Sequence, residues 1–544
     1  MDLPQWRGLI GEIDKRFQAV RVLARSGMIG GIERPDRIFG ALLALLEWDR
    51  TPAAGAAANA ARYPNDVAII DELGRLTFAE VHDRTNALAN GLAQAGIKEG
   101  QRVAIMCRNH RYFVDGVIAC SKLGADAVLL NTDFAGPQIA DVVKREKVRA
   151  LIYDEEFSDL LKEAGKRRKR FVGWVDGTPK DPTVEDVIAA SDDTEPEPPE
   201  KPGKQVILTS GTTGAPKGAA RPPISSLDPV IAILSAIPLK SREIHFIVAP
   251  MFHSWGFFHY SLGFLLASTV VLRRRFDPER TLSTIAEHEA RSAPMVPVML
   301  QRIMELPEAV RRRYDVSSLR AIPLSGSAIP GDLAVRAMDD FGDVVYNLYG
   351  STEVGYASVA TPEDLREAPG TAGRPPYGTV VKILDPDGKE VPQGEIGRIF
   401  VGSDAVFEGY TGGGNKEMVD GLMSSGDVGH FDADGRLFVT GRDDEMIVSG
   451  GENVFPREIE DLLATHESIS DAAVIGIPDE RFGQRLKAFV VARDGNTLSE
   501  DDVRDYVKRH LARFKVPREV EFLDELPRNP TGKVLKRVLA EREK

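Results

Sequence analysis

The sequence predicts an α/β protein with a large N-terminal domain and a small, separate α+β C-terminal domain. Three observations predict this. Apolar, strand-like runs alternate with amphipathic helical segments from Tyr63 onward. Glycine-rich turns separate short strands over residues 370–440, which indicates a β-rich subdomain. A compact α/β pattern then begins after Arg442. With 544 residues, the chain exceeds what one hydrophobic core usually organises.

The domain boundaries follow from these changes of pattern. We expect an N-terminal helical extension over residues 1–60, a large domain over 61–443 and a mobile C-terminal domain over 444–544. Within the extension, apolar residues recur at helical spacing and mark one face. This face either packs against the main body or forms an interfacial helix that touches a membrane or a lipid substrate. Its residues are Ile10, Ile13, Phe17, Val20 and Leu23.

Alternation of strands and helices is clearest at the start of the large domain. V-A-I-I (67–70) predicts a strand, and Thr77 with Glu80 forms a capping box that begins the next helix. R-V-A-I-M-C (102–107) predicts another strand, followed by a helix that ends at Gly124. Further strands are expected at 127–131, 149–153 and 205–209. Such alternation is typical of a parallel sheet covered by helices, and we expect two α/β sheet subdomains here.

Turn sequences and amphipathic patterns define the later regions. D-P-D-G (385–388) and D-A-D-G (432–435) are hairpin signals in the β-rich subdomain. In the C-terminal domain, strands are expected at 470–477 and 487–492, and helices at 456–463 and 500–511.

Composition restricts the classes of function. The formal net charge of −13 and the pI of about 5.4 argue against nonspecific nucleic-acid binding. Cys107 and Cys120 fit neither a zinc site nor a C-x-x-C pair, so we expect two buried apolar residues in a reducing compartment. The N-terminus lacks a secretory pattern, and no apolar run approaches the roughly 20 residues of a membrane span. We therefore expect a cytoplasmic protein.

The stretch T-S-G-T-T-G-A-P-K-G (209–218) combines glycines, hydroxyl side chains and a lysine. It is not a Walker loop, because Pro216 stands where that pattern has its second glycine. Glycines let backbone N–H groups approach a phosphate, and the loop follows a strand, where α/β sheets bind ligands. The candidate phosphate-binding residues are Thr209, Ser210, Gly211, Thr212, Thr213, Gly214 and Lys217.

Four further stretches place reactive side chains in turns. A-P-M-F-H-S-W-G (249–256) carries His253 after an apolar strand. Y-N-L-Y-G-S-T-E-V-G (346–355) offers an aromatic ring for a base, a hydroxyl for a phosphate and a carboxylate for magnesium, through Tyr349, Thr352 and Glu353. S-G-D with the later G-R supplies Asp427 and Arg442, which suit the hydroxyls of a ribose. N-P-T-G-K (529–533) presents Lys533 in a turn.

Taken in order and spacing, these motifs resemble the adenylate-forming superfamily, which includes acyl-CoA synthetases, luciferases and the adenylation domains of peptide synthetases. The resemblance also rests on G-R-D-D-E-M-I-V-S-G-G-E-N-V-F-P-R-E-I-E and extends from Tyr63 to Lys536. It implies a two-step reaction with ATP and Mg²⁺. A carboxylate attacks the α-phosphate to give acyl-AMP and pyrophosphate, and the thiol of coenzyme A then takes the acyl group.

The resemblance also implies residue roles. Lys533 bridges the carboxylate and the α-phosphate, Thr352 and Glu353 serve the α-phosphate and magnesium, and the glycine loop holds the β- and γ-phosphates. Asp427 and Arg442 bind ribose, and His253 lies near the thiol tunnel and the acyl pocket. The remaining nucleotide-binding positions are Ser325, Gly326, Tyr349, Gly350 and Ser351. Asp444 falls at the hinge, and Ser449, Gly450 and Gly451 approach coenzyme A.

Two departures from the family pattern make the subfamily harder to assign. A-A-R-P-P (219–223) follows the loop where many relatives carry a histidine, and D-D-E at the hinge lacks a common lysine. Apolar residues at 228–239 and aromatic residues near His253 favour a medium- or long-chain fatty acid.

Alternatives remain open for acid and acceptor. They are an aryl or short-chain acid–CoA ligase, a fatty acyl-AMP ligase that serves a carrier protein, a lactone-forming enzyme and a noncatalytic binding relative. Expected partners are the acid and coenzyme A, with a homodimer and peripheral membrane contact as further expectations.

Overall fold

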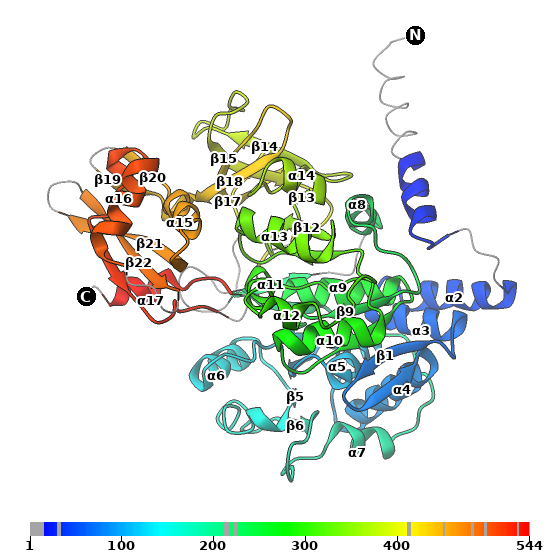
Figure 1. Cartoon of the computed structure of the whole chain (residues 1–544). Coiled ribbons are helices and arrows are strands. Elements are labelled where there is room, and N and C mark those ends of the chain that lie inside the picture. The colour runs from blue at the N-terminus through cyan, green and yellow to red at the C-terminus, as the bar shows by residue number, and fades with distance from the viewer. Residues whose placement is uncertain are drawn as a thin grey trace.

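The computed structural model describes residues 16–29, 34–209, 217–221, 226–407, 409–410, 415–449, 452–479, 483–493, 498–529 and 532–542. Figure 1 shows the C-terminal domain on one side of the molecule and the N-terminal helices on the other. Between them lie helix-covered sheets and a β-rich region, so the fold class is the predicted one.

A six-stranded sheet forms the lower part of the large domain in Figure 1. Its order is β6-β5-β3-β4-β7-β8, and β8 runs antiparallel to β7 while the other strand pairs are parallel. The strands are β3 (Arg102–Met106), β4 (Asp126–Leu129), β5 (Ala150–Tyr153), β6 (Lys169–Val172), β7 (Gln205–Thr209) and β8 (Lys217–Arg221). The helices of this region are α4 (Phe78–Gln94), α5 (Arg111–Lys122), α6 (Gly136–Arg145), η1 (Glu155–Phe157) and α7 (Val184–Ala189). The capping box of Thr77 and Glu80 begins α4 as predicted.

A second sheet has the order β2-β1-β10-β9, and single bridges through Ser292 and Met295 connect its edge to the sheet β11-β12-β13. The strands are β1 (Val67–Asp71), β2 (Gly74–Thr77), β9 (Ile244–Ile247), β10 (Thr269–Leu272), β11 (Ile322–Leu324), β12 (Val345–Tyr349) and β13 (Ser358–Ala360). The helices are α8 (Asp228–Ala236), α9 (Ser254–Leu265), α10 (Pro278–His288), α11 (Pro297–Met304), α12 (Glu308–Arg311), α13 (Gly331–Phe341) and α14 (Pro362–Glu367). The buried strands carry near-continuous apolar runs, which explains why short sequence segments could predict them.

The β-rich subdomain is an antiparallel sheet, and its strands are β14 (Val380–Leu384), β15 (Gly397–Gly402), β16 (Met418–Val419), β17 (Leu422–Phe431) and β18 (Leu437–Arg442). D-A-D-G joins β17 to β18 as a hairpin, and Gly435 has a φ of 76°, a region that favours glycine. This confirms the predicted turn.

The C-terminal domain begins with the short helix η2 (Asp443–Glu445). Its elements are β19 (Ile447–Ser449), β20 (Glu452–Val454), α15 (Pro456–Ala464), β21 (Ile469–Asp479), β22 (Gly483–Ala492), α16 (Glu500–His510), η3 (Arg513–Lys515), β23 (Glu519–Phe522) and α17 (Lys536–Glu541). All five strands form one sheet, in which β21 and β22 make a long antiparallel pair. The apolar face of α15 packs on this sheet through Ile459 and Leu463.

The N-terminal helices do not pack as the apolar pattern of the extension suggests. Residues 16–25 form a helix, but its Phe17 and Val20 side chains are exposed, and Ile10 and Ile13 lie outside the described residues. Helix α2 (Pro35–Glu47) packs against α3 (Pro52–Arg62), mainly through alanines. Small side chains on both surfaces allow this close approach, so the larger residues of α2 face outward. None of the described helices combines the length and the apolar character that crossing a bilayer requires.

Candidate active site

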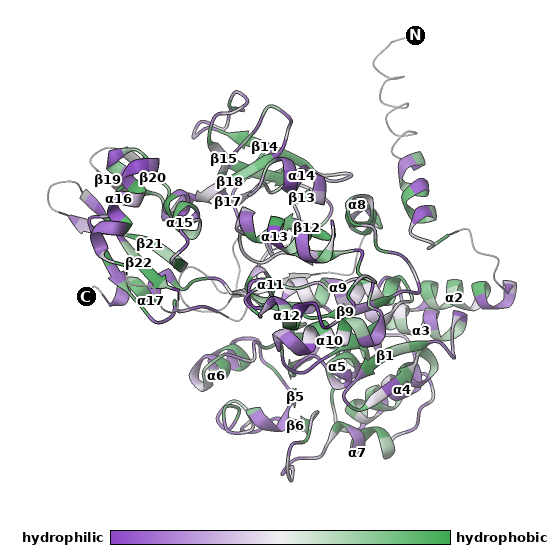
Figure 2. Cartoon of the chain, viewed as in Figure 1, coloured by the Kyte–Doolittle hydropathy of each residue, from purple (hydrophilic) through white to green (hydrophobic). Residues whose placement is uncertain are grey.

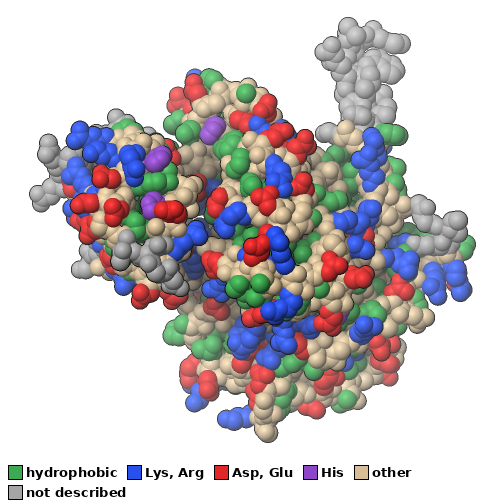
Figure 3. Space-filling view, viewed as in Figure 1, with side chains coloured by type: hydrophobic (Ala, Val, Ile, Leu, Met, Phe, Trp, Pro, Cys, Tyr) green, Lys and Arg blue, Asp and Glu red, His purple; other side chains and the backbone are tan. Residues whose placement is uncertain are grey.

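A cavity of about 1780 Å³ lies between the C-terminal domain and the rest of the chain. Figure 3 shows a hollow at this junction, with Lys and Arg side chains beside it. Helices α8, α9 and α11, the turns after β11 and β12, the ends of β17 and β18, and the segment around Lys533 all contribute to its lining. The cavity therefore brings together the motifs around His253 and Lys533, which lie 280 residues apart in the sequence.

One group of residues is organised around the carboxylate of Asp427, at the middle of β17. The Tyr349 hydroxyl donates to the Asp427 carboxylate at 2.6 Å and lies 3.0 Å from the Ser425 hydroxyl. An Arg442 guanidinium nitrogen lies 3.6 Å from the other Asp427 oxygen. Burial raises the pKa of Asp427 above its usual value, while Tyr349, Arg442 and Lys533 favour the charged form. Asp427 is thus a fixed acceptor that can face the hydroxyls of a ribose.

The side chains of Thr352 and Glu353 line the same cavity just beyond β12. The Tyr410 hydroxyl donates to one Glu353 carboxylate oxygen at 2.8 Å, and burial beside Glu353 raises the pKa of Tyr410. Magnesium prefers carboxylate oxygens, and the second Glu353 oxygen and the remaining lone pairs fit that preference. The Thr352 hydroxyl lies 3.5 Å from the hydroxyl of Ser254, at the start of α9. These residues fit the predicted phosphate and magnesium roles.

Lys533 enters the cavity on a turn of the C-terminal domain. The Asn529 side chain accepts from the Lys533 backbone N–H at 2.9 Å, and Gly532 has a φ of 78°. A Cβ atom on Gly532 would lie 2.5 Å from Cγ1 of Val298 on α11. The turn therefore packs directly against the large domain, and the positive charge of Lys533 favours the charged form of Asp427. Lys533 thus lines the same cavity as Asp427, Thr352 and Glu353.

The opposite side of the cavity is apolar. Trp255 and Phe258 of α9 stack with ring centroids 6.2 Å apart and planes 13° from parallel. Val230 and Ile233 of α8 line the cavity near them. His253 also lines it, its Nε2 is buried without a hydrogen-bond partner among the described residues, and burial lowers its pKa to about 4. A neutral His253 therefore faces the apolar side of the cavity.

Other predicted residues divide into those placed in the cavity and those outside the described part of the chain. Ser325, Gly326, Gly350 and Ser351 line the cavity. In the glycine loop, Thr209 ends β7 and pairs with Lys217, which begins β8. Asp444 lies within η2 and Ser449 ends β19. The predicted residues outside the described part are Ser210, Gly211, Thr212, Thr213, Gly214, Gly450 and Gly451.

Three further residues line the cavity that the sequence did not single out. Tyr410 holds Glu353, as described above, and Arg457 of α15 contributes positive charge near Asp427. Lys416 lies beside Gly426. A Cβ atom added to Gly426 would be 3.0 Å from the Lys416 Nζ and 3.5 Å from the two terminal guanidinium nitrogens of Arg442. The Lys416 ammonium forms no ion pair within the described residues. Tyr410 directly precedes the glycine-rich segment T-G-G-G (411–414), and this position is a sequence signal that could have pointed to it.

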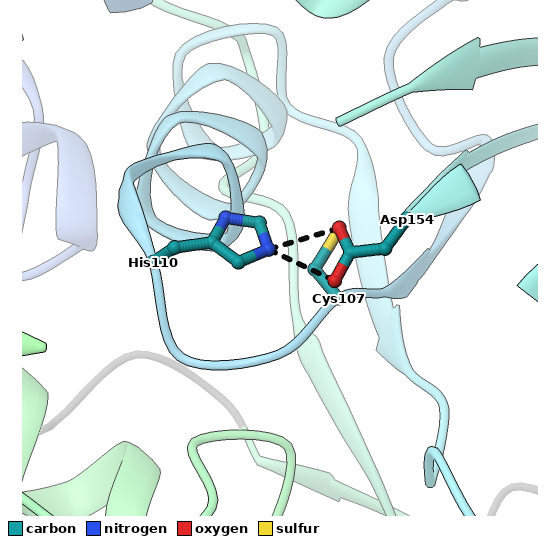
Figure 4. A group of neighbouring side chains, drawn as sticks. All are labelled: Cys107, His110 and Asp154. Atoms are coloured by element: carbon teal, nitrogen blue, oxygen red, sulfur yellow. Dashed lines mark hydrogen bonds and ion pairs between the residues drawn. The ribbon is translucent and has the colours of Figure 1, made fainter. Parts of the chain in front are cut away.

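A second cluster lies in the six-stranded sheet, away from the cavity (Figure 4). The His110 Nε2 is 2.9 Å from both Asp154 oxygens, and Cys107 lies beside them. Both cysteines are buried, as predicted. Asp154 also accepts the backbone N–H groups of Arg108 and Trp174, so its lone pairs are used. Burial raises the pKa of the Cys107 thiol, which disfavours the thiolate that a metal needs. We interpret the cluster as a structural link between β3, α5 and β5.

Comparisons with known proteins agree with this geometry. The family model described as "AMP-binding enzyme" matches residues 56–411, and the model of its C-terminal domain matches residues 458–533. The chain is 34% identical over 468 residues to a feruloyl-CoA synthase of Amycolatopsis sp, covering 85% of this chain and 92% of the relative. It is 31% identical over 502 residues to the fatty acid–[acyl-carrier-protein] ligase ScoC of Streptomyces coeruleorubidus, covering 88% and 94%.

A solved structure extends the similarity to three dimensions. The anthranilate CoA ligase AuaEII in complex with anthranoyl-AMP superimposes with a TM-score of 0.82 at 25% identity, covering 91% of this chain and 97% of that one. The match spans both domains, as the cavity between them does. The chain belongs to the AMP-binding enzyme family, the AMP-forming ligases that use ATP, Mg²⁺ and coenzyme A.

Proposed function

We propose that the protein is a CoA ligase for a hydrophobic monocarboxylic acid. The observation that carries the proposal is that one cavity combines a cationic and carboxylate-bearing side with an apolar, aromatic side. The first side suits nucleotide phosphates and ribose, and the second suits the body of an acid. The feruloyl and anthranilate relatives are named as enzymes that form CoA thioesters, while the acid and the residue roles in this chain are our proposals.

In the first step, a carboxylate oxygen of the acid bonds to the α-phosphorus of ATP while the bond to pyrophosphate breaks. Repulsion between the two anions is the main barrier, and Lys533 would stand between them as a cation. Glu353 would hold Mg²⁺, which supplies further charge neutralisation at the phosphates. Asp427, fixed by Tyr349 and Arg442, would orient the ribose. Oriented groups lower the entropic cost of bringing the reactants together.

In the second step, the thiol sulfur of coenzyme A attacks the acyl carbonyl carbon, the bond to AMP breaks and the thiol proton leaves. We propose that the C-terminal domain rotates at Asp444 between the steps, which withdraws Lys533 and brings the segment at Ser449 toward the thiol. Support comes from the position of η2, directly between β18 and β19 at the junction of the two domains. His253, kept neutral by burial, would not repel or neutralise either anion.

For the acid, we propose a ring-bearing substrate first and a medium- or long-chain fatty acid second. The stacked Trp255 and Phe258 rings offer a flat apolar wall, on which an aromatic ring packs with a gain of about 1 kcal/mol beyond burial. The relatives named for feruloyl and anthranilate substrates support a ring, and ScoC supports a fatty acid and a carrier-protein acceptor.

A panel of aromatic propenoic acids and saturated fatty acids tests this order. Pyrophosphate release should have a higher kcat/KM with ring-bearing acids, and acyl-CoA should accumulate only when coenzyme A is present. A higher kcat/KM with fatty acids would contradict the proposal of a ring-bearing substrate. Pyrophosphate release without any acyl-CoA would indicate a ligase that serves a carrier protein.

For cellular placement, we propose a cytoplasmic enzyme with peripheral membrane contact. The exposed apolar surface of α2 supports this contact. A homodimer that uses the same surface is the alternative.

A further inference from the structure

Helix α2 has an unusual distribution of side chains. Its small residues Ala41 and Ala44, with Trp48 just beyond its end, are buried against α3. Its six large apolar side chains are all exposed: Ile38 (39%), Phe39 (62%), Leu42 (53%), Leu43 (45%), Leu45 (42%) and Leu46 (82%). At about 100° per residue, these six cover roughly 160° of the helix circumference without a polar interruption. We call this set the outer face of α2.

Hydrogen bonds to the rest of the chain hold α2 in place with its outer face exposed. Figure 2 shows α2 as a mostly hydrophobic ribbon at the edge of the molecule. The helix is held there by Trp48, whose indole N–H donates to Glu195 at 3.0 Å, and by Arg37, which donates to the Arg62 carbonyl at 3.2 Å. Exposed apolar surface of this extent marks a binding site in soluble proteins. The six contiguous apolar side chains of the outer face are therefore a candidate binding surface.

The charge of the N-terminal helices as a whole indicates the kind of partner. The described residues 16–29 and 34–62 carry seven arginines and only three acidic residues, whereas the whole chain has a net charge of −13. Arg16, Arg21 and Arg25 are exposed on the preceding helix (residues 16–25), and none forms an ion pair with a described residue. At helical spacing, Arg16 and Arg21 flank the exposed Phe17 and Val20. Two-fold pairing of this surface would bring like charges together, whereas lipid phosphates would neutralise them.

We propose that the N-terminal helices dock the enzyme on an anionic lipid bilayer, with the outer face of α2 inserted among the acyl chains and Arg16, Arg21 and Arg25 at the phosphates. An apolar helix face flanked by arginines is the arrangement of an interfacial helix, and arginine side chains extend toward headgroups while their stems cover apolar surface. This deepens the membrane contact of the proposed function by naming its surface and its lipid charge. It does not depend on which acid the cavity binds.

Flotation with vesicles tests the docking on the full chain. The wild type should bind vesicles of equal parts phosphatidylcholine and phosphatidylglycerol, and bind much less to pure phosphatidylcholine or at high salt. The double variant Phe39→Glu/Leu46→Glu should reduce binding at least about tenfold, because each replaced side chain loses its apolar burial. Arg16→Gln/Arg21→Gln should reduce binding to the anionic vesicles only. Leu73→Glu is the matched control, since Leu73 is 50% exposed on another part of the surface.

Both double variants should keep the wild-type melting temperature and rate of pyrophosphate release, because the changed side chains are exposed and far from the cavity. The proposal is overturned if wild type and Phe39→Glu/Leu46→Glu bind vesicles equally, or if neither binds. It is also overturned if light scattering shows a wild-type dimer that this variant dissociates while vesicle binding is absent. That last result would assign the outer face to a second copy of the chain. Acid-dependent pyrophosphate release would be unaffected by any of these results, so failure here leaves the proposed reaction intact.

Discussion

Docking of the Lys533 turn on α11 predicts a selective effect of Gly532→Ala. In the present arrangement, the new methyl group would lie 2.5 Å from Cγ1 of Val298, well inside van der Waals contact. Gly532 also has a φ of 78°, where an alanine costs about 1–2 kcal/mol in any domain arrangement. The contact with Val298 adds a cost that exists only while the turn is docked. Overpacking of this kind typically costs about 1–3 kcal/mol.

These costs act on different half-reactions. A penalty of about 1–3 kcal/mol confined to the docked state slows adenylation by roughly 5- to 150-fold. Thioester formation from supplied acyl-AMP should change much less, because we expect the turn to leave α11 before that step. Pyrophosphate release and acyl-CoA formation from acyl-AMP are measured separately. Val298→Ala in the Gly532→Ala background should restore part of the adenylation rate, because it removes Cγ1 at 2.5 Å but keeps Cβ at 2.9 Å. Equal loss in both half-reactions, or no recovery in the double variant, would refute this reasoning.

Two other predictions concern the charged side chains of Lys416 and Asp154. Lys416→Met should raise the KM for ATP about fivefold with little change in kcat, because it removes a cation beside Arg442. Lys416→Arg should retain the wild-type KM. An unchanged KM of Lys416→Met in initial-rate assays would exclude a contact between Lys416 and the nucleotide. Asp154→Asn should lower the free energy of unfolding by about 3 kcal/mol, since it breaks the buried pair with His110. The pKa of Asp154 is lowered in the folded state, so its contribution is present above the unfolded value of about 4 and is lost as pH falls further. Urea titrations should therefore show the wild-type advantage shrinking below pH 4, and a constant difference would contradict the assignment.

Several parts of the site could be predicted because they depend on short, local patterns. Tyr349, Glu353, Asp427 and Lys533 stand in turns that are rich in glycine or proline, and the order of these motifs is itself specific. Their convergence in one cavity could be expected only from the resemblance, since the residues are far apart in the chain. Lys416 and Arg457 could not be found in this way. Their role depends on which surfaces the β-rich subdomain and α15 turn toward Asp427.

The buried face of helix α2 could not be predicted from its own sequence. An amphipathic helix normally buries its larger apolar residues, so leucine-rich residues 38–46 would be placed inward from the sequence alone. In the structure, α3 is so rich in alanine that only the small face of α2 fits closely against it. Which face is buried was therefore decided by the partner helix and not by the hydrophobicity of α2 itself. The fold class was easier to predict from the sequence, because buried parallel strands and hairpin turns each have a local sequence pattern.

The central claim is that Lys533, carried by the C-terminal domain, acts in adenylation and not in the transfer to coenzyme A. Lys533→Ala tests it most directly, with the two half-reactions measured on the same preparation. Loss of a charge that acts mainly in one transition state should lower pyrophosphate release by about 100-fold or more. The rate of acyl-CoA formation from supplied acyl-AMP should stay within about threefold of the wild type. A comparable loss in both half-reactions would contradict the account.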